Sequence, residues 1–164
     1  MARMVEFSES DLFPFPRDRV WTLLRAHLDD AMIGRIHPLI RAQRTITTSG
    51  TETTVQRSID VRGKLLTSQW KVTLRPPEYS RYEILASEGP WSEGSSVENH
   101  YSDAPGGTKI ESRMRLHIQV LPFFLPQRSM SRRILNDIDR EDRAFLSRAP
   151  EDETTLAERR APVV

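Results

Sequence analysis

One stretch decides the fold of this chain: residues 127–149, which read QRSMSRRILNDIDREDRAFLSRA. Successive residues of an α-helix are about 100° apart, so its apolar side chains fall in one arc of the helical wheel. These side chains are Met130, Ile134, Leu135, Ile138, Phe145 and Leu146. The pattern predicts one long amphipathic helix, which must bury its apolar stripe against another element.

Alternating polar and apolar residues from Leu39 onward predict that this other element is an antiparallel sheet. The expected strands are separated by turn signals at Ser49-Gly50, Arg62-Gly63, Pro76-Pro77, Glu88-Gly89-Pro90 and Ala104-Pro105-Gly106-Gly107. An earlier strand over 3–13 precedes a helix that ends near Asp29 and a second helical piece over 30–35. The expected fold is therefore α+β. It has a curved seven-stranded antiparallel sheet, two short helices after the first strand, and a long C-terminal helix over the concave face.

The turns also predict which side chains face that helix. A two-residue turn at Ser49-Gly50 puts Arg44 and Arg57 on the apolar phase of neighbouring strands. Pairing Tyr101 with Ile110 across the last hairpin aligns two more inward pairs, Asn99 with Ser112 and Val97 with Met114.

Composition excludes several classes of function. Lys and Arg number 24 against 23 acidic residues, so the net charge of +1 gives no broad field for nucleic acid, and we expect no such partner. The absence of cysteine excludes a disulfide scaffold, thiolate zinc sites and cysteine catalysis. No apolar run has the length of a signal peptide or approaches the ~18 residues of a membrane span. We therefore expect a cytoplasmic protein.

The chain reads as one domain with a tail. Residues 1–149 have the size and the patterning of one ligand-binding domain. After Pro150, residues 150–164 are first acidic and then basic without periodicity, which predicts a disordered C-terminal tail.

Several short motifs resemble a known superfamily. Residues 15–21, FPRDRVW, resemble the entry to its first helix, and Trp70 before Pro76-Pro77, the break at Glu88-Gly89-Pro90 and the turn Gly106-Gly107-Thr108 resemble recurring bacterial features. The chain resembles the START-like, or SRPBCC, superfamily over residues 3–148. That superfamily includes birch-pollen-allergen-like proteins, lipid-transfer domains and polyketide cyclases. The resemblance implies a helix-grip fold and a hydrophobic cavity for lipids, polyketides, steroids or similar molecules. It implies no catalytic residue, because no catalytic motif is matched.

The candidate ligand-binding residues are those expected on the inner face of the sheet and on the helix stripe. They are Arg44, Arg57, Trp70, Asn99, Tyr101, Ser112, Met114, Ile134, Ile138 and Asp142. Trp70 offers a large apolar surface. Asn99, Tyr101 and Ser112 either orient a polar group of an apolar ligand or bond to one another.

Arg44 and Arg57 are the strongest polar anomaly of the expected sheet face. A buried arginine needs an anion or several acceptors, because an unpaired buried charge is costly. Three interpretations remain open: the arginines snorkel from the rim, they bind a ligand carboxylate, or they pair with Asp142, which interrupts the helix stripe.

The four histidines show no metal-ligand spacing, and no dinucleotide, phosphate-loop or nucleophile-elbow motif is present, so we expect no metal and no cofactor. The apolar segment 121–126, LPFFLP, forms either a packed corner or a pocket lip with transient membrane contact. The sequence predicts no oligomeric state.

The function expected from these observations is the binding of a hydrophobic small molecule by a carrier or sensor. One alternative is an enzyme of the polyketide cyclase/dehydrase or aromatase kind, in which Arg57, Tyr101 or Asp142 moves protons. Another is a protein-interaction module whose cavity is filled by side chains.

Overall fold

The structure is a computed structural model that describes residues 3–61, 63–89, 91–118, 132–133 and 135–147. Its elements, in chain order, are β1 (Arg3–Phe13), α1 (Arg17–Ala26), α2 (Ile33–Ile36), β2 (Ile40–Ser49), β3 (Glu52–Val61), β4 (Lys64–Arg75), β5 (Tyr79–Ser87), β6 (Ser96–Ala104) and β7 (Gly107–Ile118). A further helix, described at 132–133 and 135–147, is called the closing helix below.

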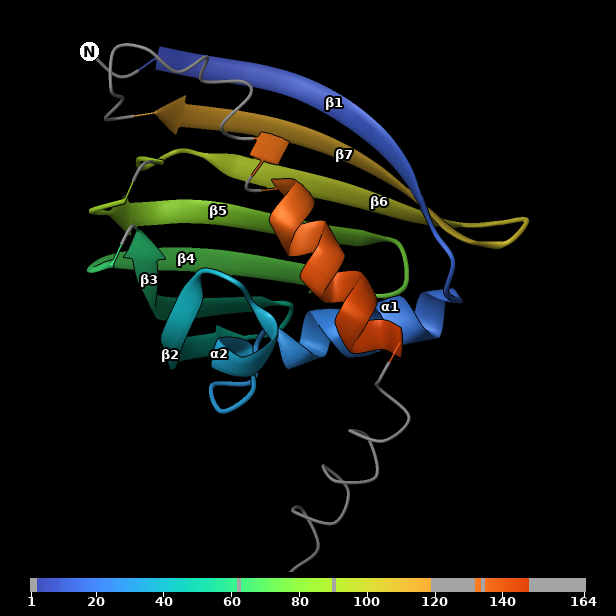
Figure 1. The fold of residues 1–164 in the computed structure, drawn as a ribbon, viewed down its shortest axis with the longest axis horizontal. Coiled ribbons are helices and arrows are strands. Elements are labelled where there is room, and N and C mark those ends of the chain that lie inside the picture. Colours follow the sequence, from blue (N-terminus) through green and yellow to red (C-terminus); the bar gives the residue numbers. More distant parts are fainter. Residues whose placement is uncertain (1–2, 62, 90, 119–131, 134, 148–164) are drawn as a thin grey trace, which may run out of the picture.

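The seven strands form one antiparallel sheet in the order β1-β7-β6-β5-β4-β3-β2. The sheet is strongly curved, and the closing helix crosses its concave face, with α1 and α2 on the β2 side (Figure 1). This arrangement confirms the predicted fold class: an α+β helix-grip fold with two short helices after the first strand.

The last hairpin has the predicted register. Tyr101 pairs with Ile110, and Asn99 pairs with Ser112. The turn depends on glycine: Gly106 has a φ of 89° and Gly107 a φ of 151°, which L-residues with a side chain rarely adopt. A Cβ atom at Gly107 would also meet the carbonyl group of Phe13, so this glycine lets the start of β7 approach the end of β1.

The register of the first hairpin differs from the prediction. Ser49 pairs with Glu52, so the turn lies one residue later than expected, and β2 contains two register shifts along its length. Because a one-residue shift moves a side chain to the opposite face, Gln43 takes the inward position opposite Arg57. The prediction that Arg44 faces inward is wrong. Arg44 is exposed, and its Nη2 donates to Oε1 of Gln56 at 3.0 Å.

Two apolar clusters hold the layers together. The larger joins α1 and α2 to the closing helix through residues such as Trp21, Ile33, Phe145 and Leu146. The smaller lies on β1 and β7, where Leu135 of the closing helix packs against it. Full burial of such side chains stabilises a fold by roughly 1.5–3 kcal/mol each, so these clusters fix both ends of the described part of the closing helix.

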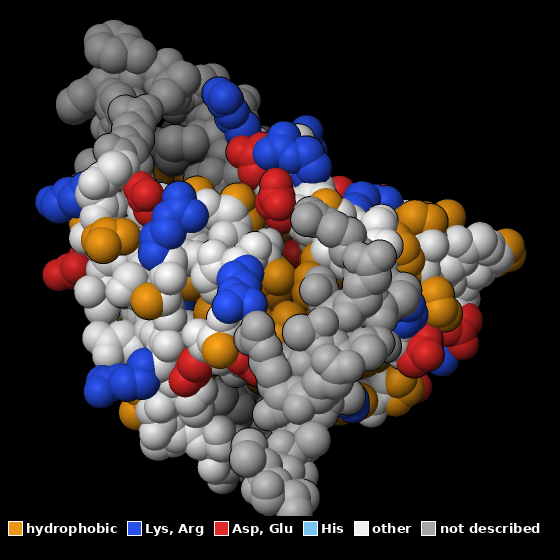
Figure 2. Space-filling view, turned by 60° about the horizontal axis from the view of Figure 1, so that its bottom comes forward, with side chains coloured by type: hydrophobic (Ala, Val, Ile, Leu, Met, Phe, Trp, Pro, Cys, Tyr) orange, Lys and Arg blue, Asp and Glu red, His pale blue; other side chains and the backbone are white. Residues whose placement is uncertain are grey.

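Charged side chains of both signs are interspersed on the molecular face shown in Figure 2, and hydrophobic side chains gather near its centre. No helix among the described residues is long and apolar enough to cross a membrane. The segment 121–126 and the predicted tail 150–164 lie outside the described residues, as do Met130 and Ile134 of the predicted stripe.

Candidate functional site

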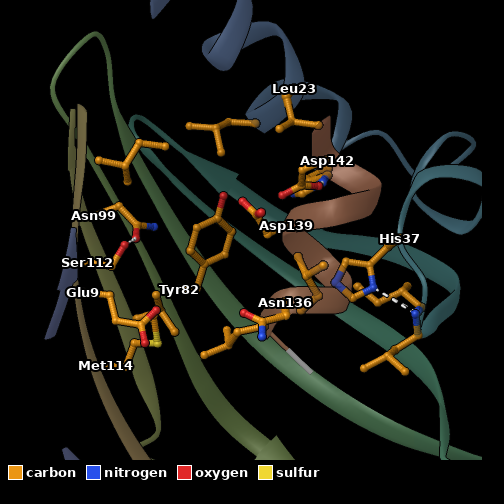
Figure 3. Close-up of a pocket in the computed structure, with 18 of the residues that line it drawn as sticks. Glu9, Leu23, His37, Tyr82, Asn99, Ser112, Met114, Asn136, Asp139 and Asp142 are labelled. Carbon is orange, nitrogen blue, oxygen red and sulfur yellow. Dashed lines mark hydrogen bonds and ion pairs between the residues drawn. The ribbon is translucent and has the colours of Figure 1, made fainter. Parts of the chain in front are cut away.

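A cavity of about 1190 Å³ lies between the concave face of the sheet and the closing helix. Most of its lining surface is apolar, contributed by side chains such as Leu23, Ile40, Trp70, Ile84, Met114 and Ile138. Figure 3 shows side chains projecting into this space from the sheet on one side and from the closing helix on the other.

Most of the predicted site residues line this cavity. The lining includes Arg57, Trp70, Asn99, Tyr101, Ser112, Met114, Ile138 and Asp142. Arg44 lies on the outer face of the sheet for the reason given above. Ile134 lies outside the described residues.

Arg57 is a buried cation, and two of the five N–H donors of its guanidinium have an acceptor among the described residues. Its Nε donates to Oε1 of Gln43 at 2.8 Å, and its Nη2 donates to the carbonyl oxygen of His27 at 3.3 Å. Its guanidinium lies 5.4 Å from the centre of the Trp70 ring, within the range of a cation–π interaction. Burial lowers the pKa of Arg57 to about 10, and nearby Tyr82 and Asp30 oppose that shift. Arg57 therefore remains charged at neutral pH.

Hydrogen bonds link Arg57 to the carboxylate of Asp30 through one intervening side chain. Gln43 links the two, since its Nε2 donates to Oδ1 of Asp30 at 2.9 Å. Burial acts to raise the pKa of Asp30, but hydrogen bonds from Thr45 and Gln43 outweigh it and the pKa is lowered. The Arg57 charge is thus balanced through an amide rather than by direct contact.

Of the three interpretations left open for the arginines, a direct pair of Arg57 with Asp142 does not occur among the described contacts. Within the described chain, Asp142 makes a hydrogen bond with the ring of His27, with 3.0 Å between Oδ1 and Nε2. The helical wheel correctly turns Asp142 toward the cavity, but the C-terminal end of α1 lies between it and β3 and presents His27 instead. Among the described residues, His27 therefore joins Arg57 to Asp142, binding the first with its carbonyl oxygen and the second with its ring.

The polar residues of the opposite wall bond to one another. Oγ of Ser112 donates to Oδ1 of Asn99 at 2.7 Å, Nδ2 of Asn99 donates to Oγ of Ser80 at 3.1 Å, and Ser80 lies 2.7 Å from the hydroxyl of Tyr101. Burial raises the pKa of the Tyr101 hydroxyl, which therefore stays protonated. This network resolves the earlier alternatives in favour of mutual bonding, although Asn99, Tyr101 and Ser112 still line the cavity.

The cavity wall also contains polar side chains that the predicted set does not include, among them His27, His37 and Tyr82. The alternation of β5 indicates that Tyr82 faces inward, and burial raises the pKa of its hydroxyl. The two histidine rings lie 6.0 Å apart, although they come from different short segments at the ends of α1 and α2. No sequence periodicity marks such segments. Among the described residues, no group of three or more His, Cys, Asp or Glu side chains is placed to hold a metal ion.

Comparison with known proteins shows the fold. No protein-family model matches the sequence, and no curated protein matches it either. Solved structures do match. Ara h 8.0201 has 17% identity and a TM-score of 0.70, over 88% of this chain and 98% of that chain. The aromatase/cyclase Zhui from Streptomyces sp. R1128 has 16% identity and a TM-score of 0.63, over 89% and 95%.

A third match is the di-domain ARO/CYC StfQ from the steffimycin biosynthetic pathway, with 14% identity and a TM-score of 0.71. The match covers 90% of this chain and 52% of StfQ, so the present chain spans about half of that protein. Together these likenesses show that the chain has the helix-grip fold that its sequence motifs imply.

Proposed function

We propose that this protein binds a hydrophobic small molecule, such as a lipid or polyketide, between the sheet and the closing helix, as a carrier or sensor. The observation that carries the proposal is the cavity of about 1190 Å³ with its mostly apolar lining. Ligand pockets for drug-sized molecules are typically about 300–1,000 Å³ and predominantly apolar, with a few placed polar groups. A cavity of this volume also argues against the interaction module with a filled interior.

The experiment combines native mass spectrometry with thermal unfolding. The purified protein is weighed intact under native conditions and again after denaturing extraction, and any released molecule is identified. The extracted protein is then titrated with palmitate, an anthraquinone and cholesterol. A ligand at a hundred times its Kd stabilises the folded state by about 2.7 kcal/mol, so we expect at least one probe to raise the Tm. No bound mass and no Tm shift with any probe would contradict the proposal.

A second candidate function is a cyclase, and one observation favours it. The cavity wall contains an imidazole–carboxylate pair, His27 and Asp142, which is a chemistry suited to proton transfer. Arg57 and Tyr101 are less suited to that role, because their polar atoms are already engaged with Gln43 and Ser80. The same mass spectrometry separates the two functions: a carrier returns its ligand unchanged, whereas a cyclase returns a product whose mass has changed by the loss of water.

A further inference from the structure

The ring of His37 is held in one orientation by the backbone that follows it. Its Nδ1 accepts hydrogen bonds from the backbone N–H groups of Leu39 and Ile40, both at 3.2 Å. A ring turned by 180° would place a C–H group against those two donors and leave both without an acceptor, at a cost of about 1–3 kcal/mol for each one that is buried. The turn into β2 therefore fixes Nδ1 on the side of the backbone and Nε2 on the opposite side of the ring.

This orientation also fixes the tautomer. A nitrogen that accepts hydrogen bonds carries no hydrogen, so in the neutral ring the hydrogen must be on Nε2. Protonation of Nδ1 would break both backbone bonds. In addition, burial lowers the pKa of His37 well below its ordinary value, and the neighbouring His27 and Arg57 add to that shift. His37 is thus a neutral donor at the pH of a cell.

The Nε2–H group faces the cavity. His37 is one of the lining residues, and Figure 3 shows one ring nitrogen joined to the backbone while the other lies on the side of the ring nearer the cavity. Among the described residues, none accepts a hydrogen bond from Nε2. The cavity therefore contains an oriented N–H donor beside apolar side chains.

Loss of hydration disfavours an anionic partner for this donor. Asp139 and Asp142 of the closing helix line the same cavity, as do Arg133 and Arg143, and Arg143 already donates from Nε to Asp139. Arg57, the buried cation of the site, already donates from Nε and Nη2. A carboxylate on the ligand would lose its hydration in this mostly apolar space, whereas an uncharged oxygen loses much less.

We propose that His37 Nε2–H donates a hydrogen bond to an uncharged carbonyl oxygen, of a ketone, ester or amide, on an otherwise apolar ligand. This inference rests on the proposed ligand-binding function and names the chemical class of the ligand. It makes His37 a specificity-determining residue, since it distinguishes a carbonyl compound from the matching hydrocarbon.

The test uses two rigid probes of nearly equal shape, 9-fluorenone and fluorene, which differ in one carbonyl oxygen. Their dissociation constants are measured for the unmodified protein and for His37→Asn. Asparagine places an oxygen near the position of Nδ1 and so keeps the acceptor for the following N–H groups, but its amide nitrogen reaches less far into the cavity than Nε2. The ratio of the two constants is compared between proteins, because the hydration of each probe then cancels.

We expect the preference for fluorenone over fluorene to fall about three- to tenfold in His37→Asn, the usual range of one hydrogen bond. His100→Asn is the matched control, because His100 is exposed, does not line the cavity and undergoes the same change of side chain, and it should leave the ratio unchanged. Nitrogen-15 NMR of the ring supplies a readout independent of binding, and it should show the Nε2–H tautomer in the unmodified protein.

The outcomes separate the two proposals. If both probes bind and His37→Asn leaves their ratio unchanged, the His37 inference is overturned and the ligand-binding function stands. An Nδ1–H tautomer also overturns it. Tighter binding of fluorene-9-carboxylate than of fluorenone, lost in Arg57→Ala, would assign the polar contact to Arg57 and an anion instead. If none of the probes binds, both proposals fail.

Discussion

At the scale of single residues, Arg57 is a buried cation that does not bind a carboxylate directly. Gln43 stands between it and the nearest linked carboxylate, Asp30. Gln43 accepts from Arg57 with its oxygen and donates to Asp30 with its nitrogen, so the amide passes the interaction from one charge to the other. Such an arrangement avoids the full desolvation of a direct buried ion pair, which often offsets the Coulombic attraction. Asp142 binds instead the ring of His27, whose backbone carbonyl accepts from Arg57.

This separation predicts independent mutational effects. Arg57→Ala should lower the free energy of unfolding by roughly 2–4 kcal/mol, because it opens a cavity and leaves the Gln43 oxygen without its donor. Adding Asp142→Ala should recover none of that loss, since Asp142 is not the partner of Arg57. Urea unfolding of the two single variants and the double variant provides the measurement.

The control is a second double-mutant cycle, made with His27→Ala, Asp142→Ala and the variant that combines them. Residues in direct contact show coupling energies of about 0.5–3 kcal/mol, so this pair should deviate from additivity. Arg57 and Asp142 make no described contact with each other and share His27 as a partner, so their coupling energy should be smaller than that of His27 and Asp142. Strong coupling between Arg57 and Asp142 would show that a direct bond forms between them in solution.

The sequence predicts which face of the sheet a side chain occupies only where polar and apolar residues alternate along a regular strand. The inward positions of Arg57, Trp70 and Asn99 follow from a period of two counted along regular strands. Arg44 does not, because shifts of register in β2 reverse the phase there, and nothing in the sequence marks where they occur. His37 was missed for a different reason: its orientation depends on two backbone N–H groups in a turn, a contact that no periodicity reveals.

At the scale of elements, the closing helix is attached to β1 by a polar contact beside its apolar one. Nη2 of Arg143 donates to Oδ2 of Asp11 at 2.6 Å, and its Nε donates to Oδ2 of Asp139 at 2.9 Å. The guanidinium also lies 4.4 Å from the centre of the Phe13 ring. One side chain therefore joins two acids on different elements and covers an aromatic ring, and it lines the edge of the cavity.

We expect Arg143→Ala to lower the free energy of unfolding by about 1 kcal/mol, a modest value because the side chain is partly exposed and its ion pairs are weakened by solvent. Arg140→Ala is the matched control on the same helix. Arg140 is 70% exposed, and the ion pairs that it makes with described residues are to Asp137 and Glu141 of its own helix, so its loss should change little. Thermal and urea unfolding measure both, and equal effects would show that Arg143 does not fasten the helix to β1.

At the scale of the whole molecule, the architecture could be predicted and the contents of the cavity could not. Each element has its own local signal: a helical stripe, alternation, or a turn at glycine or proline. The curved sheet and the closing helix then have one mutual arrangement that buries both apolar surfaces. Cavity volume, in contrast, depends on the side-chain rotamers and the exact distance between helix and sheet. The predicted domain boundary at 149 and the disordered tail remain predictions.

The cavity itself supplies the last prediction. Ile138 lies on the cavity-facing side of the closing helix, partly accessible from the interior space, so a larger side chain there can extend into empty volume rather than into packed atoms. Ile138→Trp should keep or raise the Tm of the ligand-free protein, because it gains dispersion contacts and buried apolar surface. The same change should weaken the binding of apolar probes at least tenfold, since the indole occupies their space.

Arg140→Trp is the control, because it places an indole on the exposed face of the same helix. It should leave the affinity for the probes unchanged. Affinity is measured by titration calorimetry, and the Tm of each protein is measured without ligand. A large fall in Tm for Ile138→Trp would mean that the space is filled in solution. If Ile138→Trp binds the probes as tightly as the unmodified protein, the molecules occupy some other surface. Only a stable Ile138→Trp variant with weak binding supports a container formed by the sheet and the closing helix, because that pair of results requires a space that is both empty and the place where ligand binds.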